Sequence, residues 1–245
     1  MIKESFLKKQ INKSKREGKT SHFLKKLVFM VVDQALKDHY GNDRSMKCFQ
    51  SSLVIQMVLE KIQIESTIIQ GAVCVPKVFE NSKQFGWEGF WGDDYHIWLQ
   101  TEFYEWVDLT IHYLPLHPSN QHNNALLAMP SIWWEDATKS PRIIKYMQEL
   151  GTIHVLEESS LNDLEEFKKI TNTYFYKVLD TYTVQQIEFA PVLHDLYSMD
   201  KLYEKQEPWA LKTLEFEKLE FPHPPWIQER EKELFAEYIK LQKKL

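Results

Sequence analysis

The sequence predicts an α+β fold in which a helix with a cysteine near its start packs on an antiparallel sheet, followed by a helical extension. Three observations support this expectation. Apolar residues recur at three- and four-residue spacing between positions 21 and 62, which is typical of amphipathic helices. Runs rich in β-branched and aromatic residues follow between 67 and 111, and the helical spacing returns from residue 160 onward. With 245 residues, 43% of them hydrophobic, the chain is long enough for one large packed unit.

The composition excludes several classes of protein. Only seven glycines are present, and no GxxxxGK or GxGxxG string predicts a phosphate-binding loop. The net charge of -5 gives no general attraction to nucleic acid. No apolar run approaches the length of a membrane span, and the N-terminus lacks the apolar segment of a signal peptide. We therefore expect a cytoplasmic protein without a cofactor, a specific nucleic-acid partner or a membrane partner.

The first 20 residues are expected to form a basic arm. Nine lysines and arginines occur in residues 1–27, against Glu4 and Glu17 as the acids. Charged termini commonly fray, so a solvated arm is the simpler interpretation, and a contact for an anionic partner is the alternative. An amphipathic helix is predicted over 21–39, and Gly41 ends it.

Cys48 is predicted to lie in the first turn of the next helix, with Ser45 as its N-cap. The free N–H groups and the positive end of a helix dipole favour a thiolate over a thiol. The alternative is that Cys48 is an ordinary small core residue. Cys74 lies within an apolar strand predicted over 67–75, and apolar burial raises the pKa of a thiol, so it is expected to be structural. Two cysteines are too few for a disulfide framework.

Residues 95–100 and 103–111 are predicted to form a hairpin that carries His96 and Asp108. Opposed residues in an antiparallel pair point to the same side of the sheet. A turn centred on Glu102 would place His96 opposite Asp108, Trp98 opposite Trp106 and Gln100 opposite Tyr104. A two-residue turn would place Asp108 on the other face, so a shared site requires an odd loop or a bulge.

These residue types can perform acyl chemistry together. A thiolate attacks a carbonyl carbon, an imidazole takes and returns the proton, and a carboxylate fixes the tautomer of the imidazole. Cys48, His96 and Asp108 supply these three groups in that order. They stand in the segments C-F-Q-S-S-L-V, H-I-W and W-V-D-L-T, on a predicted helix and two predicted strands.

In this layout the chain resembles the transglutaminase-like branch of the papain-like superfamily, to which arylamine N-acetyltransferases and bacterial transglutaminase-like peptidases are similar. The resemblance covers roughly residues 21–115. It implies a papain-like core, a nucleophilic Cys48, a base in His96, an orienting Asp108 and acyl transfer through a thioester. Lys47 departs from the pattern, because the family often has an apolar or aromatic residue before the nucleophile.

The lining of a substrate cleft is less defined. An aromatic, glycine-containing loop is predicted over 77–93, either as a flap over a cleft or as a lid on the core. The cleft candidates are Trp87, Trp91, Trp98 and Gln34. The two candidates for an oxyanion donor are the backbone N–H of Cys48 and the side chain of Gln34.

The remaining chain is expected to support this core. An irregular segment over 113–130 is followed by a strand at 131–136, a helix at 141–150 and a strand at 152–156. Helices follow from 160, with a kink or break at Pro191 and a final helix over 225–243. We expect a basic arm over 1–20, a catalytic core over 21–158 and a helical extension over 159–245 that packs on the same unit and offers an oligomer contact.

Three functions are consistent with these patterns. The first is a thiol-dependent hydrolase or acyltransferase that acts on a peptide, an amide or an acyl-thioester. The second is a catalytically inactive binding protein on the same fold, which would use the aromatic loop and the basic arm. The third is a metal-dependent hydrolase, whose ligands would come from Asp93, Asp94, His96, His112, His117 and His122. No metal is expected, because loop histidines at the spacing of His112, His117 and His122 share no helix or strand face.

Overall fold

The protein is described by a computed structural model that covers residues 1–80, 85–90, 95–116, 126–131, 133–138, 143–149, 158–189 and 202–242. Helices and an antiparallel sheet are both present, which confirms the α+β class. The helices are α1 Glu4–Glu17, α2 His22–Tyr40, α3 Cys48–Lys61, η1 Ile111–Leu116, α4 Glu158–Thr181, α5 Val184–Glu188, α7 Pro208–Lys218 and α8 Pro225–Gln242. The strands are β1 Ser66–Val78, β2 Phe85–Phe90, β3 His96–Thr101, β4 Glu105–Asp108, β5 Trp133–Asp136 and β6 Lys145–Gln148. The predicted strand at 152–156 and Pro191 lie outside the described residues.

The N-terminal segment is a packed helix, so the prediction of a frayed arm is wrong. Ile2 and Ile11 are buried, and the ring of Phe6 meets that of Phe23 edge-on at a centroid distance of 5.0 Å. Apolar side chains spaced four or five residues apart give this basic helix one buried face, which outweighs the tendency of a charged terminus to fray. Gly18 ends the helix in the left-handed conformation (φ 63°).

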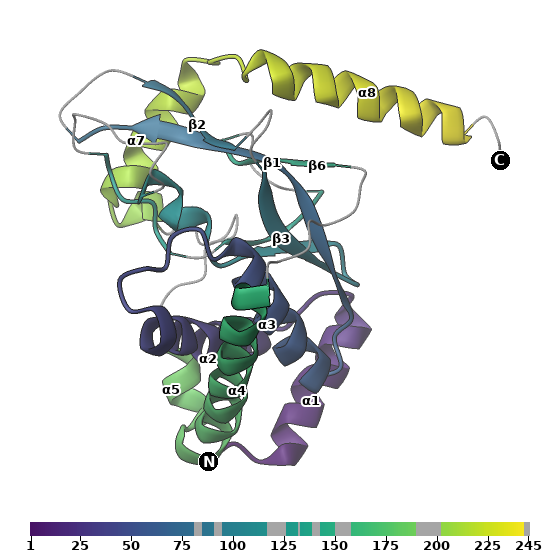
Figure 1. Cartoon of the computed structure of the whole chain (residues 1–245), viewed down its shortest axis with the longest axis vertical. Helices are drawn as coiled ribbons and strands as arrows, with labels where there is room; N and C mark the ends of the chain where they lie inside the picture. The colour runs from purple at the N-terminus through teal and green to yellow at the C-terminus, as the bar shows by residue number, and fades with distance from the viewer. Residues whose placement is uncertain are drawn as a thin grey trace.

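Helices α2 and α3 form the helical layer beneath the sheet. Ser21 caps α2 by accepting a hydrogen bond from the backbone N–H of Leu24, and α2 ends at Tyr40, next to the predicted stop at Gly41. Figure 1 shows α1, α2, α4 and α5 gathered around α3 at one end of the sheet, with α7 and α8 at the other. The helix that begins with Cys48 packs between the sheet and the helices α2 and α4.

The sheet is antiparallel, in the order β2-β1-β3-β4-β5, and β6 pairs with β1. The first half of β1 pairs with β3, from Ser66 opposite Thr101 to Gly71 opposite His96. The second half pairs with β2, and residues 71–74 also pair with β6. One long strand thus brings the start of β3, the end of β2 and β6 to the middle of the sheet.

Two local predictions in this region are wrong. Residues 85–90, predicted as part of a loop, form β2, and residues 145–148, predicted as helix, form β6. Gly89 explains the first difference: it has φ 155°, and a Cβ there would lie 1.9 Å from the carbonyl oxygen of Val73. A glycine that usually signals a loop here permits two strands to approach closely. Residues 145–148 form a strand because they pair with the distant β1, and the local spacing of apolar residues does not reveal that pairing.

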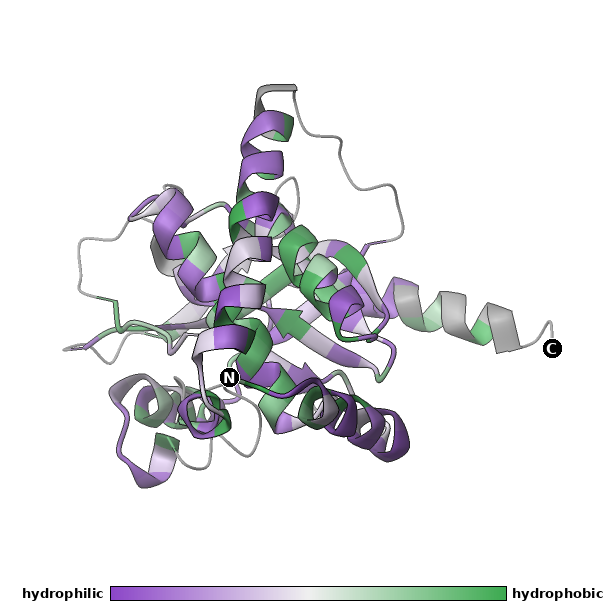
Figure 2. Ribbon diagram, turned by 90° about the horizontal axis from the view of Figure 1, so that it is seen from below, coloured by the Kyte–Doolittle hydropathy of each residue, from purple (hydrophilic) through white to green (hydrophobic). Residues whose placement is uncertain are grey.

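The two faces of the sheet carry separate cores. Leu99 and Val107 pack against α2 and α3, whereas Trp98 and Trp133 belong to the core on the opposite face with residues of α7. Helix α8 contacts the sheet through Ile227, which packs with Ala72, Cys74 and Met147. Figure 2 shows hydrophobic colour on the central strands and hydrophilic colour on the outer turns of the surrounding helices. Among the described residues, no helix is both long and apolar enough to cross a membrane.

Candidate functional site

Cys48 is the first residue of α3. The N-cap is Lys47, whose side chain makes no capping hydrogen bond, so the prediction that Ser45 caps the helix is wrong. Met46 adopts φ 60°, and the turn it makes delays the helix start until Cys48. The first helical hydrogen bond runs from the N–H of Ser51 to the carbonyl of Lys47, at 2.8 Å. The N–H of Cys48 therefore lies among those at the helix start that have no intrahelical acceptor. Its side chain is partly exposed, whereas Cys74 is buried.

The hairpin has an odd loop, but its centre lies at Phe103 rather than at Glu102. Leu99 is opposite Val107, and Gln100 is opposite Trp106. The predicted opposed pairs are therefore wrong by two positions, while the parity of the loop is confirmed. Tyr104 takes the left-handed conformation (φ 58°), as three-residue hairpin loops require. This register places His96 diagonally across from Asp108 on the same face of the sheet.

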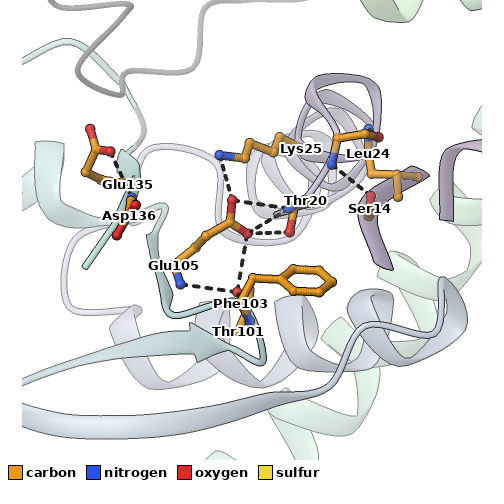
Figure 3. Close-up of polar contacts among 10 residues, drawn as sticks. Ser14, Thr20, Leu24, Lys25, Thr101, Phe103, Glu105, Glu135 and Asp136 are labelled. Carbon is orange, nitrogen blue, oxygen red and sulfur yellow. Dashed lines mark hydrogen bonds and ion pairs between the residues drawn. The ribbon is translucent and has the colours of Figure 1, made fainter. Parts of the chain in front are cut away.

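A buried carboxylate fixes this turn. Glu105 accepts hydrogen bonds from the backbone N–H of Thr20 (3.2 Å) and from the hydroxyl groups of Thr20 (2.5 Å) and Thr101 (3.3 Å). Lys25 pairs with the same carboxylate at 3.0 Å (Figure 3). Glu105 and Lys25 are both largely buried, so each charge needs the other to offset the cost of its burial. The junction between α1 and α2 thus holds the end of the hairpin, a role that the sequence analysis did not assign.

Asp108 is saturated with hydrogen-bond donors. Its Oδ2 lies 2.6 Å from Nε2 of His96 and accepts the hydroxyl of Tyr146 at 2.9 Å. Its Oδ1 accepts the N–H and the hydroxyl of Thr110 (2.9 and 3.0 Å) and the N–H of Ile111 (3.0 Å). Burial alone would raise the pKa of Asp108, but the charge of His96 and these hydrogen bonds hold the pKa below its ordinary value. An ionised carboxylate offers about four lone-pair directions, and because donors occupy both oxygens of Asp108, its ionised form is favoured over the protonated form.

This arrangement sets the tautomer and charge of His96. Burial alone would lower the pKa of His96, but the charge of Asp108, its hydrogen bond and the interactions with Cys48 raise it to about 10. Because Nε2 donates to Asp108, Nδ1 is the ring nitrogen that remains for the thiol of Cys48. Helix α3 is tied to β3 at this point by Ser52, whose hydroxyl donates to the carbonyl of Ile97 at 3.4 Å. The structure therefore brings Cys48, His96 and Asp108 together.

Aromatic rings surround the buried part of this group. The ring centroids of Phe90 and Trp98 lie 6.1 and 6.3 Å from that of His96. Tyr146 packs against Trp98 and Trp106, each at 5.0 Å. Tyr146 was missed by the sequence analysis, because it stands where a helix was predicted and reaches Asp108 only through the pairing of β6 with β1. Its pKa is raised well above the ordinary value by burial and by the nearby charge of Asp108.

The candidates for the cleft lining lie in different places. Trp98 is fully buried behind His96 and is a core residue, not a cleft wall. The indole N–H of Trp87 donates to the carbonyl of Pro222 at 2.7 Å, so this side chain is held by the C-terminal region. Gln34 lies on the exposed face of α2, and its amide donates to Asp38 at 2.9 Å. It is not placed as an oxyanion donor, which leaves the N–H of Cys48. Trp91 lies outside the described residues.

The metal hypothesis gains no support from the part of the chain that is described. Within those residues, no group of three or more His, Cys, Asp or Glu side chains is arranged to hold a metal ion. Four of the named candidates lie outside the described residues: Asp93, Asp94, His117 and His122. His96, another of the named candidates, is already engaged by Asp108.

Comparison with known proteins gave no relative. No protein-family model, no curated protein and no solved structure matches this chain. The class of this protein is therefore inferred from its own residues. It is an α+β protein in which a cysteine at a helix start meets a buried histidine, and that histidine meets a buried aspartate.

Proposed function

We propose that this protein is a thiol-dependent hydrolase or acyltransferase with a papain-like, transglutaminase-like core. Cys48 is the nucleophile, His96 the acid and base, and Asp108 the group that orients His96. The observation that carries the proposal is the buried bond of 2.6 Å between Nε2 of His96 and Oδ2 of Asp108, together with the interaction of Cys48 with the same ring. The substrate class is a peptide, an amide or an acyl-thioester.

In the first half of the reaction, Nδ1 of His96 takes the proton from Sγ of Cys48. The thiolate attacks the substrate carbonyl carbon, and the carbonyl oxygen becomes an oxyanion near the N–H groups at the start of α3. When the carbon–nitrogen or carbon–sulfur bond breaks, Nδ1–H gives its proton to the leaving group, and a thioester remains on Cys48. Asp108 keeps its charge throughout because its oxygens are occupied by donors.

In the second half, Nδ1 removes a proton from water or from an acceptor amine or alcohol. That oxygen or nitrogen attacks the thioester, the bond to Sγ breaks, and Cys48 leaves as the thiolate. Hydrolysis and transfer differ only in which acceptor reaches the thioester. The thiol must stay reduced for this chemistry, so a reducing cytoplasmic location is part of the proposal.

Two features of the site favour the thiolate. The N-terminus of α3 supplies a positive dipole end at Cys48, and a protonated His96 supplies a full positive charge beside it. A partly exposed thiol in such surroundings is a typical reactive cysteine, whereas the pKa of the buried Cys74 is raised by its desolvation to about 12.

The test is the pH dependence of alkylation of Cys48 by iodoacetamide, with Cys48→Ala as the blank. The wild type is expected to react well below pH ~8.5, where a free thiol titrates, and His96→Ala should lose this low-pH reaction. Peptides, amides and acyl-thioesters would then be screened as substrates. A Cys48 that reacts only above that pH, whether or not His96 is present, would exclude the enzyme and favour a binding protein on this fold.

A further inference from the structure

Tyr146 is buried in the site, as His96 and Asp108 are. Its hydroxyl donates to Oδ2 of Asp108 at 2.9 Å, the same oxygen that accepts the hydrogen bond from His96 at 2.6 Å. The remaining donors to Asp108 all reach Oδ1. Tyr146 is therefore the only group besides His96, among the described residues, that holds the oxygen facing the imidazole.

The ring of Tyr146 is fixed independently of its hydroxyl. It packs between Trp98 and Trp106, with both centroids at 5.0 Å. The strand that carries it is paired with β1, with Tyr146 opposite Val73. A phenylalanine would keep these contacts, so the hydroxyl can be removed while the packing is retained.

The strand β6 is also anchored from outside by α8. Lys145 forms an ion pair with Glu231, and Met147 packs with Ile227. The residues on either side of Tyr146 thus bind the C-terminal helix, while Tyr146 itself points to the opposite side of the strand, toward Asp108. This alternation follows from the two-residue period of a strand. The contacts with α8 thus hold the backbone from which the side chain of Tyr146 extends.

We propose that Tyr146 is a positioning residue of the reaction: its hydroxyl holds Oδ2 of Asp108 in line with Nε2 of His96 and keeps the carboxylate charged. The inference rests on the proposed function, because it assigns Tyr146 a role in supporting the pair of Cys48 and His96. Two donors on Oδ2 favour the ionised carboxylate, and without the hydroxyl that oxygen would accept a proton at a higher pH.

The experiment measures the rate of Cys48 alkylation by iodoacetamide against pH in the wild type, His96→Ala, Tyr146→Phe and Tyr174→Phe. The last variant is the matched control, because Tyr174 also donates its hydroxyl to a carboxylate, that of Asp38 on α2, which is not one of the proposed catalytic residues. Tyr146→Phe is expected to move the acid limb of the profile upward by about one pH unit, as the loss of a hydrogen bond to a charged group predicts. The plateau rate should stay within about twofold, and Tyr174→Phe should match the wild type.

The outcomes separate the two proposals. If the wild type shows no acid limb that depends on His96, the proposed function fails, and the inference fails with it. If the wild type shows that limb and Tyr146→Phe has the same profile as Tyr174→Phe, the inference alone is overturned, and Tyr146 is only a packing residue.

A second measurement covers the case in which Tyr146→Phe does not fold. In wild-type protein labelled with carbon-13 in tyrosine, the Cζ resonance of Tyr146 should stay constant across the acid limb of alkylation, because the hydroxyl reports the charge of Asp108 and the proposal keeps that charge through the limb. A resonance that titrates with the midpoint of that limb would show that Asp108 loses its charge there and would contradict the proposal.

Discussion

Replacing Cys48 with serine is expected to change how the stability of the protein depends on pH. The pKa of His96 is about 10 in the folded chain, whereas a free histidine titrates near pH ~6.5. A pKa that is raised by folding contributes stability that is fully present below the unfolded value and is lost as pH rises through the folded value. For His96 alone, the free energy of unfolding should fall by about 1.4 kcal/mol per pH unit above pH ~6.5.

The proposed ion pair cancels this slope in the wild type. Around pH 7.5 the unfolded pair holds about one proton, on the thiol of Cys48, and the proposed ion pair of the folded chain also holds one, on His96. The numbers of protons are equal, so the pair adds no slope. In Cys48→Ser the charge and hydrogen bond of Asp108, the larger causes of the raised pKa, still hold the proton on His96 in the folded chain, while the unfolded chain holds almost none at these groups. The stability gap between wild type and variant should therefore widen by about 1.4 kcal/mol from pH 7 to pH 8.

Urea unfolding at half-unit steps between pH 6.5 and 8, with a reducing agent present, measures this gap. Cys74→Ala is the control, since the pKa of this buried thiol is raised to about 12 and it keeps its proton in both states over most of this range. The control should follow the pH dependence of the wild type. Parallel stability profiles for the wild type and Cys48→Ser would mean that the thiol keeps its proton when the chain folds, and the ion pair would be refuted.

Three further outcomes are expected. Glu105→Gln leaves the buried charge of Lys25 without its partner and should lower the free energy of unfolding by about 3–5 kcal/mol, measured by urea titration; an unchanged midpoint would contradict the role of this pair. Gly89→Ala forces a Cβ into a strand backbone and should cost about 2–3 kcal/mol or more, while Gly86→Ala, with open space at the corresponding position, should cost far less. In the native protein at pH 7, peptide mapping after alkylation should find label on Cys48 and none on the buried Cys74; equal labelling would contradict the difference in burial.

The sequence predicted the parts of the site that depend on local pattern. The helix after Cys48 follows from apolar spacing, and the strands around His96 and Asp108 follow from alternation and β-branched content. The shared face of His96 and Asp108 follows from the parity of the loop, which the three-residue turn confirms. Each of these features is decided within about fifteen residues, where spacing is informative.

The missed parts depend on contacts between distant segments. Tyr146 meets Asp108 from 38 residues away, and Glu105 meets Thr20 from 85 residues away. No local pattern shows that Lys145–Gln148 will be completed as a strand by β1, and the charges of α1 conceal that Ile11 is buried. The sequence shows the type of each side chain, but its distant partners are decided by tertiary contacts such as the pairing of β6 with β1.

The register of the hairpin depends both on local sequence pattern and on contacts between distant segments. A turn centred on Glu102 would have put His96 directly opposite Asp108, with Cβ atoms about 5 Å apart. The observed turn, held by Glu105, puts them on a diagonal, where Cβ atoms lie about 7–8 Å or somewhat less apart. The longer separation suits two extended side chains that meet end to end, and it leaves Oδ2 accessible to Tyr146 as well. The buried carboxylate at the turn thus sets the geometry in which His96 is held.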